Sequence, residues 1–205
     1  MSPFPFRYRS IGKLPWLCCL AIGSLTVAAQ HYRFRVLGQD EGLLNLNVRS
    51  VLQDKAGFLW LGTGNGVFRF DGVGFTRFSS KEGLPAAYTL ALAESATGEL
   101  WVSVQGGLAR YRDGRFRAVA APGPSMVRAM AGTATGEMIL ASEEGLYVAS
   151  AAGEIKRMRQ GGTTTVAVAR DGAIWFDCGR RHFVFHWKSL LRLRSGFVMC
   201  YAYPP

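Results

Sequence analysis

One phrase recurs four times along this 205-residue chain and constrains its fold more than any other feature. Each copy joins a short apolar run, a glycine-containing turn, an aromatic or aliphatic run and a second glycine-rich turn. The aligned turn glycines are 41, 38 and 36 residues apart: Gly57, Gly98, Gly136 and Gly172. β-Type units repeated at such a period are typical of propellers and other repeated sheets. The repeat therefore predicts an all-β fold, although a fold alone does not specify a function.

The first copy shows what one repeat contains. Residues 48–53 alternate apolar and polar side chains, as a half-buried strand does. Further strands are predicted at residues 58–63, 67–70 and 75–78, with glycine-containing turns between them. Four short antiparallel strands are the content of one propeller blade. By the same pattern, blades are predicted at about residues 46–80, 87–120 and 127–159, with an incomplete blade at 165–178.

A tryptophan occupies the same place in three of the copies. Trp60, Trp101 and Trp175 align, and Ile139 takes this position in the third copy. A large flat side chain between stacked blades removes much apolar surface from water, which is worth about 2–3 kcal/mol. We therefore interpret these four residues as packing residues.

The net charge of +10 is concentrated at the two ends of the chain. Residues 1–29 carry three basic residues and no acid, and residues 179–205 carry five basic residues and no acid. The repeats between them hold 16 basic and 14 acidic residues and are nearly neutral. Because nucleic-acid-binding proteins present a basic surface on the folded body, we exclude nucleic acid as a partner.

The N-terminal 29 residues have the three parts of a secretory signal peptide. Arg7, Arg9 and Lys13 precede an uncharged apolar stretch at residues 14–27, and small residues lead to Gln30. The alternative is an uncleaved membrane anchor, but the stretch is shorter than the roughly 20 residues of a spanning helix. The sequence therefore predicts a signal peptide at 1–29 and an exported repeat region at 30–178.

The segment from Asp54 to Phe70 resembles the two-component regulator propeller repeat, with the pattern D-x-x-G-x-L-W-x-G-T. The connectors at residues 40–43 and 81–84 are similar to the "EGL" connectors of that family. The resemblance covers roughly residues 33–178 and weakens in the third and fourth copies. It implies a β-propeller in the exported sensor region of a hybrid histidine kinase-like signalling protein. It also implies a carbohydrate or other small extracytoplasmic ligand.

Three functions follow from these patterns. The first is a periplasmic ligand-sensing module, whose signal passes through a longer, membrane-associated parent protein. The second is a propeller scaffold for protein–protein interaction. The third is an enzyme, because residues 171–176 are similar to the repeat of streptogramin lyase-type propellers. Those enzymes use a catalytic histidine and a metal, and the repeat body holds only His31, so we expect no enzyme activity.

We assign no catalytic residue, no metal site and no cofactor from the sequence. His182 and His186 have the i, i+4 spacing of two ligands on one helical face, yet no acidic or cysteine partner lies nearby. The ligand-binding residues are not selected either. The polar candidates in the loops are Asn45, Asn47, Arg49, Asn65, Tyr88 and Gln105.

The two ends of the repeat region predict an incomplete, open propeller. The pattern stops near Gly179, and residues 179–205 form an aberrant basic and aromatic tail. This tail is either an extension, with an amphipathic helix at 183–193, or the sign of a fragment or a frame-shifted product whose C-terminal blades are missing. Residues 32–37 align with 75–78 and predict a fourth strand without its blade. About three and a half blades fall short of the four to eight of closed rings.

Overall fold

The computed structural model describes residues 34–120, 123–178 and 181–186. The predicted signal peptide at 1–29 and the part of the tail beyond residue 186 lie outside these ranges. The chain divides into two compact units, residues 1–36 and 37–205, and the second contains all the strands described below. In the described ranges, no helix is long and apolar enough to span a membrane.

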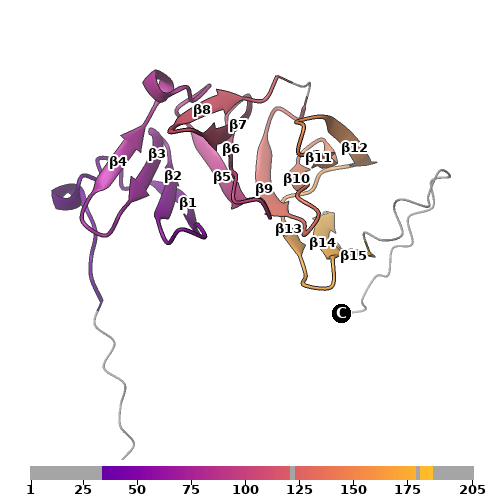
Figure 1. Cartoon of the computed structure of the whole chain (residues 1–205). Coiled ribbons are helices and arrows are strands. Elements are labelled where there is room, and N and C mark those ends of the chain that lie inside the picture. Colours follow the sequence, from indigo (N-terminus) through magenta and orange to yellow (C-terminus); the bar gives the residue numbers. More distant parts are fainter. Residues whose placement is uncertain (1–33, 121–122, 179–180, 187–205) are drawn as a thin grey trace, which may run out of the picture. The chain divides into compact units, whose positions relative to one another are not determined.

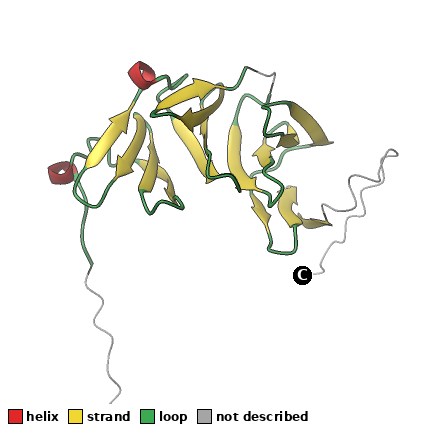
Figure 2. Ribbon diagram, in the orientation of Figure 1, coloured by secondary structure: helices red, strands yellow, loops and turns green. Residues whose placement is uncertain are grey.

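Nearly all the regular structure is β-strand, arranged in sheets that follow one another in chain order (Figures 1 and 2). The first sheet has the order β1 (Val48–Gln53), β2 (Leu59–Thr63), β3 (Gly66–Phe70), β4 (Phe75–Phe78). The second has the order β5 (Thr89–Glu94), β6 (Leu100–Val104), β7 (Gly107–Arg112), β8 (Arg115–Ala118). The third has β9 (Val127–Gly132), β10 (Met138–Ser142), β11 (Gly145–Ala149), β12 (Ile155–Gln160), and the last has β13 (Val166–Val168), β14 (Ala173–Cys178), β15 (Arg181–His186).

This architecture confirms the predicted all-β fold of four-stranded antiparallel blades. In the first sheet, β1 and β4 have the predicted bounds, β2 begins one residue later, and β3 begins one residue earlier. Each neighbouring pair is antiparallel, with Leu52 opposite Trp60 and Trp60 opposite Arg69 in the first sheet. Three complete sheets and one three-stranded sheet agree with the expected three and a half blades of an incomplete propeller.

The four-residue phrase that ends in the aligned glycine builds the turn between the first and second strands of a blade. The side chains of Asp54, Ser95 and Thr133 accept hydrogen bonds from the backbone N–H four residues later, at 2.9, 3.1 and 3.1 Å. The aligned glycine N–H donates to the backbone carbonyl of the same capping residue. All four glycines have φ between 82° and 93°, a region that favours a residue without a Cβ. Each repeat therefore forms this turn through hydrogen bonds among its own residues.

The "EGL" connectors form two equivalent short 3₁₀ helices, η1 (Gln39–Glu41) and η2 (Ser80–Glu82). In each, the final glutamate accepts a 2.7 Å hydrogen bond from the N–H of the residue that precedes the helix. The glycine that follows has a positive φ, and the next residue, Leu43 or Leu84, is buried. A Cβ on Gly42 would lie 3.2 Å from the Phe75 carbonyl oxygen, and one on Gly83 would lie 2.1 Å from that of Phe116. The glycine lets the connector approach the fourth strand of the following blade.

Consecutive sheets pack through apolar clusters, with β1 against β5, β5 against β9, and β9 against β13. Trp60 is 2% exposed, and its ring lies 4.9 Å from that of Tyr111 and 6.4 Å from that of Phe116 in the next blade. Trp101 and Ile139 occupy the same place in the next two clusters and are 1% and 0% exposed. The packing role predicted for these three residues is confirmed.

Trp175 departs from that prediction, because 45% of it is exposed. The equivalent tryptophans are covered by the sheet that follows them, and β13–β15 is the last sheet in the described residues. Burial at this repeat position depends on the neighbouring blade. The repeat position alone does not produce it.

Two further expectations about the ends of the repeat region are corrected. Residues 34–38 form no strand, since the described residues supply no partner strand to hydrogen-bond with them. Residues 181–186 form β15, paired antiparallel with β14, where the sequence suggested a tail that could begin a helix at 183. The first part of this tail therefore continues the last sheet.

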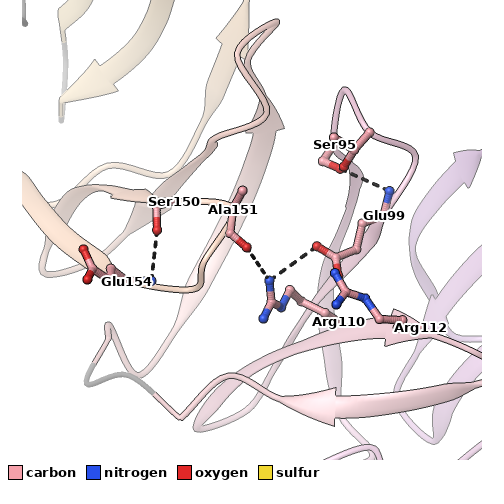
Figure 3. A network of polar contacts seen from close by, with 8 residues as sticks. Ser95, Glu99, Arg110, Arg112, Ser150, Ala151 and Glu154 are labelled. Carbon is pink, nitrogen blue, oxygen red and sulfur yellow. Dashed lines mark hydrogen bonds and ion pairs between the residues drawn. The ribbon is translucent and has the colours of Figure 1, made fainter.

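A polar network joins the second and third sheets at the end of the blades where the first strand finishes (Figure 3). The Arg110 guanidinium donates a 2.9 Å hydrogen bond to the Ala151 carbonyl oxygen and lies 3.5 Å from a Glu99 carboxylate oxygen. Arg112 pairs with the other oxygen of Glu99 at 2.9 Å. The Arg110 guanidinium also lies 5.3 Å from the Trp101 ring centroid. The Arg110–Ala151 hydrogen bond links the two blades at this end, and the site described next lies at the opposite end of the strands.

Candidate functional site at the starts of the first strands

A cavity of about 350 Å³ lies where the first strands of three blades begin. Its wall is formed by five residues at these strand starts: Asn47 just before β1, Val48 and Arg49 at the start of β1, Leu90 on β5 and Arg128 on β9. It lies within the second compact unit, which contains all three blades. Cavities of this size accommodate small ligands.

Three of the five lining residues share one position in the repeat. Arg49, Leu90 and Arg128 each lie eight residues before the aligned turn glycine of their own blade. Thr164 has that place in the fourth copy. Blades arranged around a common channel present the same repeat position to the same end of it. The convergence of these side chains is therefore a consequence of the repeat.

Arg49 is exposed, and its guanidinium lies 4.8 Å from the centroid of the Tyr88 ring. This cation–π contact orients the guanidinium through its flat face and leaves its in-plane N–H groups available. The backbone carbonyl oxygen of Tyr88 accepts a 2.9 Å hydrogen bond from the Gln105 N–H, which ties the Tyr88 backbone to the loop after β6. Across the described ranges, no carboxylate forms an ion pair with Arg49.

Arg128 is oriented by a carboxylate. Its Nε donates a 3.0 Å hydrogen bond to Oε1 of Glu143, and its Nη2 contacts the same oxygen. The neighbouring Glu144 accepts hydrogen bonds from the Ser125 hydroxyl at 2.7 Å and from the Ser125 N–H at 3.2 Å. These bonds lower the pKa of Glu144 and keep it ionised. The two glutamates thus stabilise the loop before β9 and the turn after β10.

The structure places the six sequence candidates in different roles. Asn47 and Arg49 line the cavity, and Tyr88 supports Arg49 from outside it. Asn45 accepts a 2.9 Å hydrogen bond from the Asn47 N–H, which shapes the loop that enters β1. Asn65 accepts a 2.7 Å hydrogen bond from Arg77, and the Gln105 backbone holds Tyr88.

Leu90 and Arg128 line the cavity although the sequence did not single them out. The signal that could have found them is the repeat register, because both occupy the position of Arg49 in their own blades. A search by residue type misses this, since a leucine at the start of a strand is ordinary core composition.

Asp177, on β14, accepts three hydrogen bonds from the two residues that precede β13. It accepts from the Thr164 hydroxyl at 2.6 Å, the Thr164 N–H at 2.8 Å and the Thr165 N–H at 2.7 Å. Partial burial would raise the pKa of this carboxyl. The hydrogen bonds from Thr164 and Thr165 outweigh burial and lower the pKa from 3.8 to about 2.

This pKa predicts an acid-sensitive contribution to stability. Because the folded-state pKa lies below 3.8, ionised Asp177 stabilises the fold above that value, and its contribution is lost as the pH falls towards about 2. We expect Asp177→Asn to be less stable than the parent at pH 7 and the gap to narrow between pH 4 and pH 2, as measured by urea unfolding. A gap that stays constant over this range would contradict the role.

The described residues offer no evident metal centre, since no group of three histidine, cysteine, aspartate or glutamate side chains gathers among them. His182 and His186 both belong to β15. A strand separates residues i and i+4 by about 13 Å along its axis, whereas a helix brings them within about 6 Å of one another. The helical premise behind a two-histidine site is therefore removed.

Comparison with known proteins matches residues 42–65 to the two component regulator propeller family. Among solved structures, the extracellular domain of the hybrid two component system BT3049 from B. thetaiotaomicron has a TM-score of 0.66 and 18% identity, over 86% of this chain and 29% of that one. The corresponding domain of BT4673 from the same organism has a TM-score of 0.60 and 22% identity, over 68% of this chain and 21% of that one.

Virginiamycin B lyase from Staphylococcus aureus is also similar, with a TM-score of 0.58 and 14% identity, over 67% of this chain and 52% of that one. No curated protein matches the sequence. This chain spans only 21–29% of the length of the two extracellular domains described above. At these identities the solved structures show the fold alone. Residues 42–65 therefore carry a two component regulator propeller repeat, and the chain folds as blades of a β-propeller.

Proposed function

We propose that the chain is an extracytoplasmic ligand-sensing propeller module of a two-component-type signalling protein. The observation that carries this proposal is the cavity, to which one repeat position contributes a side chain from each of three successive blades. The family match and the similarity to extracellular domains of hybrid two component systems support the same assignment. The ligand would be a carbohydrate or another small molecule outside the cytoplasm.

In this proposal the module is exported and transmits its signal through a longer parent protein. Similar solved chains are extracellular domains several times longer than this one. The similar lyases share the fold, and we propose no lyase activity here.

A second candidate function, a scaffold that contacts other proteins, is favoured by the apolar surfaces of the outer sheets. Val51 is 62% exposed, whereas Leu92 and Met130, at the same repeat position in inner blades, are each 8% exposed. Trp175 at the other end of the array is 45% exposed. Both surfaces are of the kind that blades bury against one another. In this second candidate function, a separate protein packs against them.

Calorimetric titration of the purified chain with a panel of neutral and acidic oligosaccharides tests the sensing function. We expect at least one compound to bind and to raise the unfolding temperature, because a ligand that binds only the folded state stabilises it. Retention of the folded protein with no binding from the whole panel would favour the scaffold function.

A further inference from the structure

We propose that the cavity at the starts of β1, β5 and β9 binds a small ligand through an oxyanion group, such as a sugar carboxylate or sulfate. This inference rests on the proposed sensing function and adds the chemical class of the ligand. Two of the five lining residues, Arg49 and Arg128, are permanently cationic, and none of the five is acidic. The surrounding repeat body is nearly neutral, so this local excess is not a product of overall charge.

The Arg49 guanidinium is prepared for such a group. Tyr88 contacts its flat face at 4.8 Å, which restricts the side chain before a ligand arrives. The N–H groups of a guanidinium lie in its plane and match the two oxygens of a carboxylate or sulfate. Stacking on an aromatic ring therefore does not compete with oxyanion binding.

Arg128 keeps donors available despite its ion pair. Glu143 contacts Nε and Nη2 through one oxygen, so that Nη1 lies outside the contact. The side chains of Arg128 and Glu143 are 38% and 55% exposed, and an exposed ion pair of this kind contributes little stability for an incoming oxyanion to compete with. Glu143 is not part of the cavity wall. Its role is to orient the guanidinium towards the wall.

The other lining residues suit a small polar molecule with one apolar face. The Asn47 amide can donate to and accept from hydroxyl groups, and Leu90 supplies apolar surface between the two arginines in repeat order. A volume of about 350 Å³ accommodates one or two sugar rings. The site therefore fits an acidic saccharide fragment better than a long neutral chain.

The test compares digalacturonate and a sulfated disaccharide with fully methyl-esterified digalacturonate, which has the same rings without charge. We expect at least one acidic probe to bind and the ester to bind at least tenfold more weakly. Arg49→Gln and Arg128→Gln should each weaken acidic binding about tenfold, because each removes a charge-assisted hydrogen bond. Binding should also weaken as salt is raised.

Arg117→Gln is the matched control. This arginine on β8 has a side chain that is 71% exposed, lies outside the cavity wall and undergoes the same loss of charge. We expect it to bind the acidic probe as the parent does. Arg49→Lys keeps the charge without the planar fork and should retain only part of the affinity. Circular dichroism of every variant checks that the fold is intact.

Each remaining outcome overturns the inference. Equal binding of ester and acid, or equal loss in Arg117→Gln, would remove the oxyanion assignment while leaving the sensing function in place. Binding only of neutral oligosaccharides would do the same. Failure of both acidic probes would end the inference, and the neutral panel would then decide whether the sensing function also fails.

Discussion

Replacement of Trp101 by alanine will lower the free energy of unfolding by about 3–5 kcal/mol, as measured by urea denaturation. Trp101 is 1% exposed and belongs to the apolar cluster between the second and third sheets. The Arg110 guanidinium lies 5.3 Å from its ring centroid and also donates to the Ala151 carbonyl oxygen of the third sheet. The substitution leaves a cavity between two blades and removes one side of this contact.

Trp175→Ala is the matched control, because it makes the same change at the same repeat position. With 45% of the residue exposed, it should cost clearly less than Trp101→Ala, about 1–2 kcal/mol. Equal losses for the two variants would show that the tryptophan acts within its own blade. That result would contradict the view that its contribution depends on packing against the next blade.

Gly83→Ala will destabilise the protein by about 3–5 kcal/mol, or prevent folding of the second blade. The residue has a φ of 91°, where a Cβ costs about 1–2 kcal/mol. The added Cβ would also lie 2.1 Å from the Phe116 carbonyl oxygen, so the connector or β8 must move. Thermal and urea unfolding of the purified variant measure the loss.

Gly106→Ala separates the cost of the positive φ from the cost of the close approach to another backbone atom. Gly106 has a φ of 87°, and a Cβ there would meet no atom within 4 Å. We expect about 1–2 kcal/mol from the backbone conformation alone. If Gly83→Ala cost no more than Gly106→Ala, the close approach of the connector to Phe116 would not matter to stability.

Local features of the fold could be predicted because local chemistry produces them. The bounds of β1 and β4 follow from the turn-forming residues that flank each run. Asp54 builds its turn through hydrogen bonds from Gly57 and Phe58, three and four residues later, so no distant contact is needed. The aligned aromatic position likewise marks the interior of a blade wherever another blade follows.

The candidate site was only partly predictable. Asn47 and Arg49 are polar residues in a loop entering a strand, and residue type alone brings them to notice. Leu90 and Arg128 join them because β1, β5 and β9 pack side by side. That arrangement arises from contacts between residues about 40 positions apart, which residue type does not reveal.

The sequence by itself determined the repeating unit: its strands, its capped turns and its glycine-dependent connectors. These depend on hydrogen bonds and backbone conformations within a few residues of one another. Only the tertiary structure decided which equivalent positions are buried and which converge. Trp101 and Trp175 have the same place in the repeat, yet they differ from 1% to 45% exposure. The physical reason is that burial and cavity formation belong to pairs of neighbouring blades, whereas the repeat specifies one blade at a time.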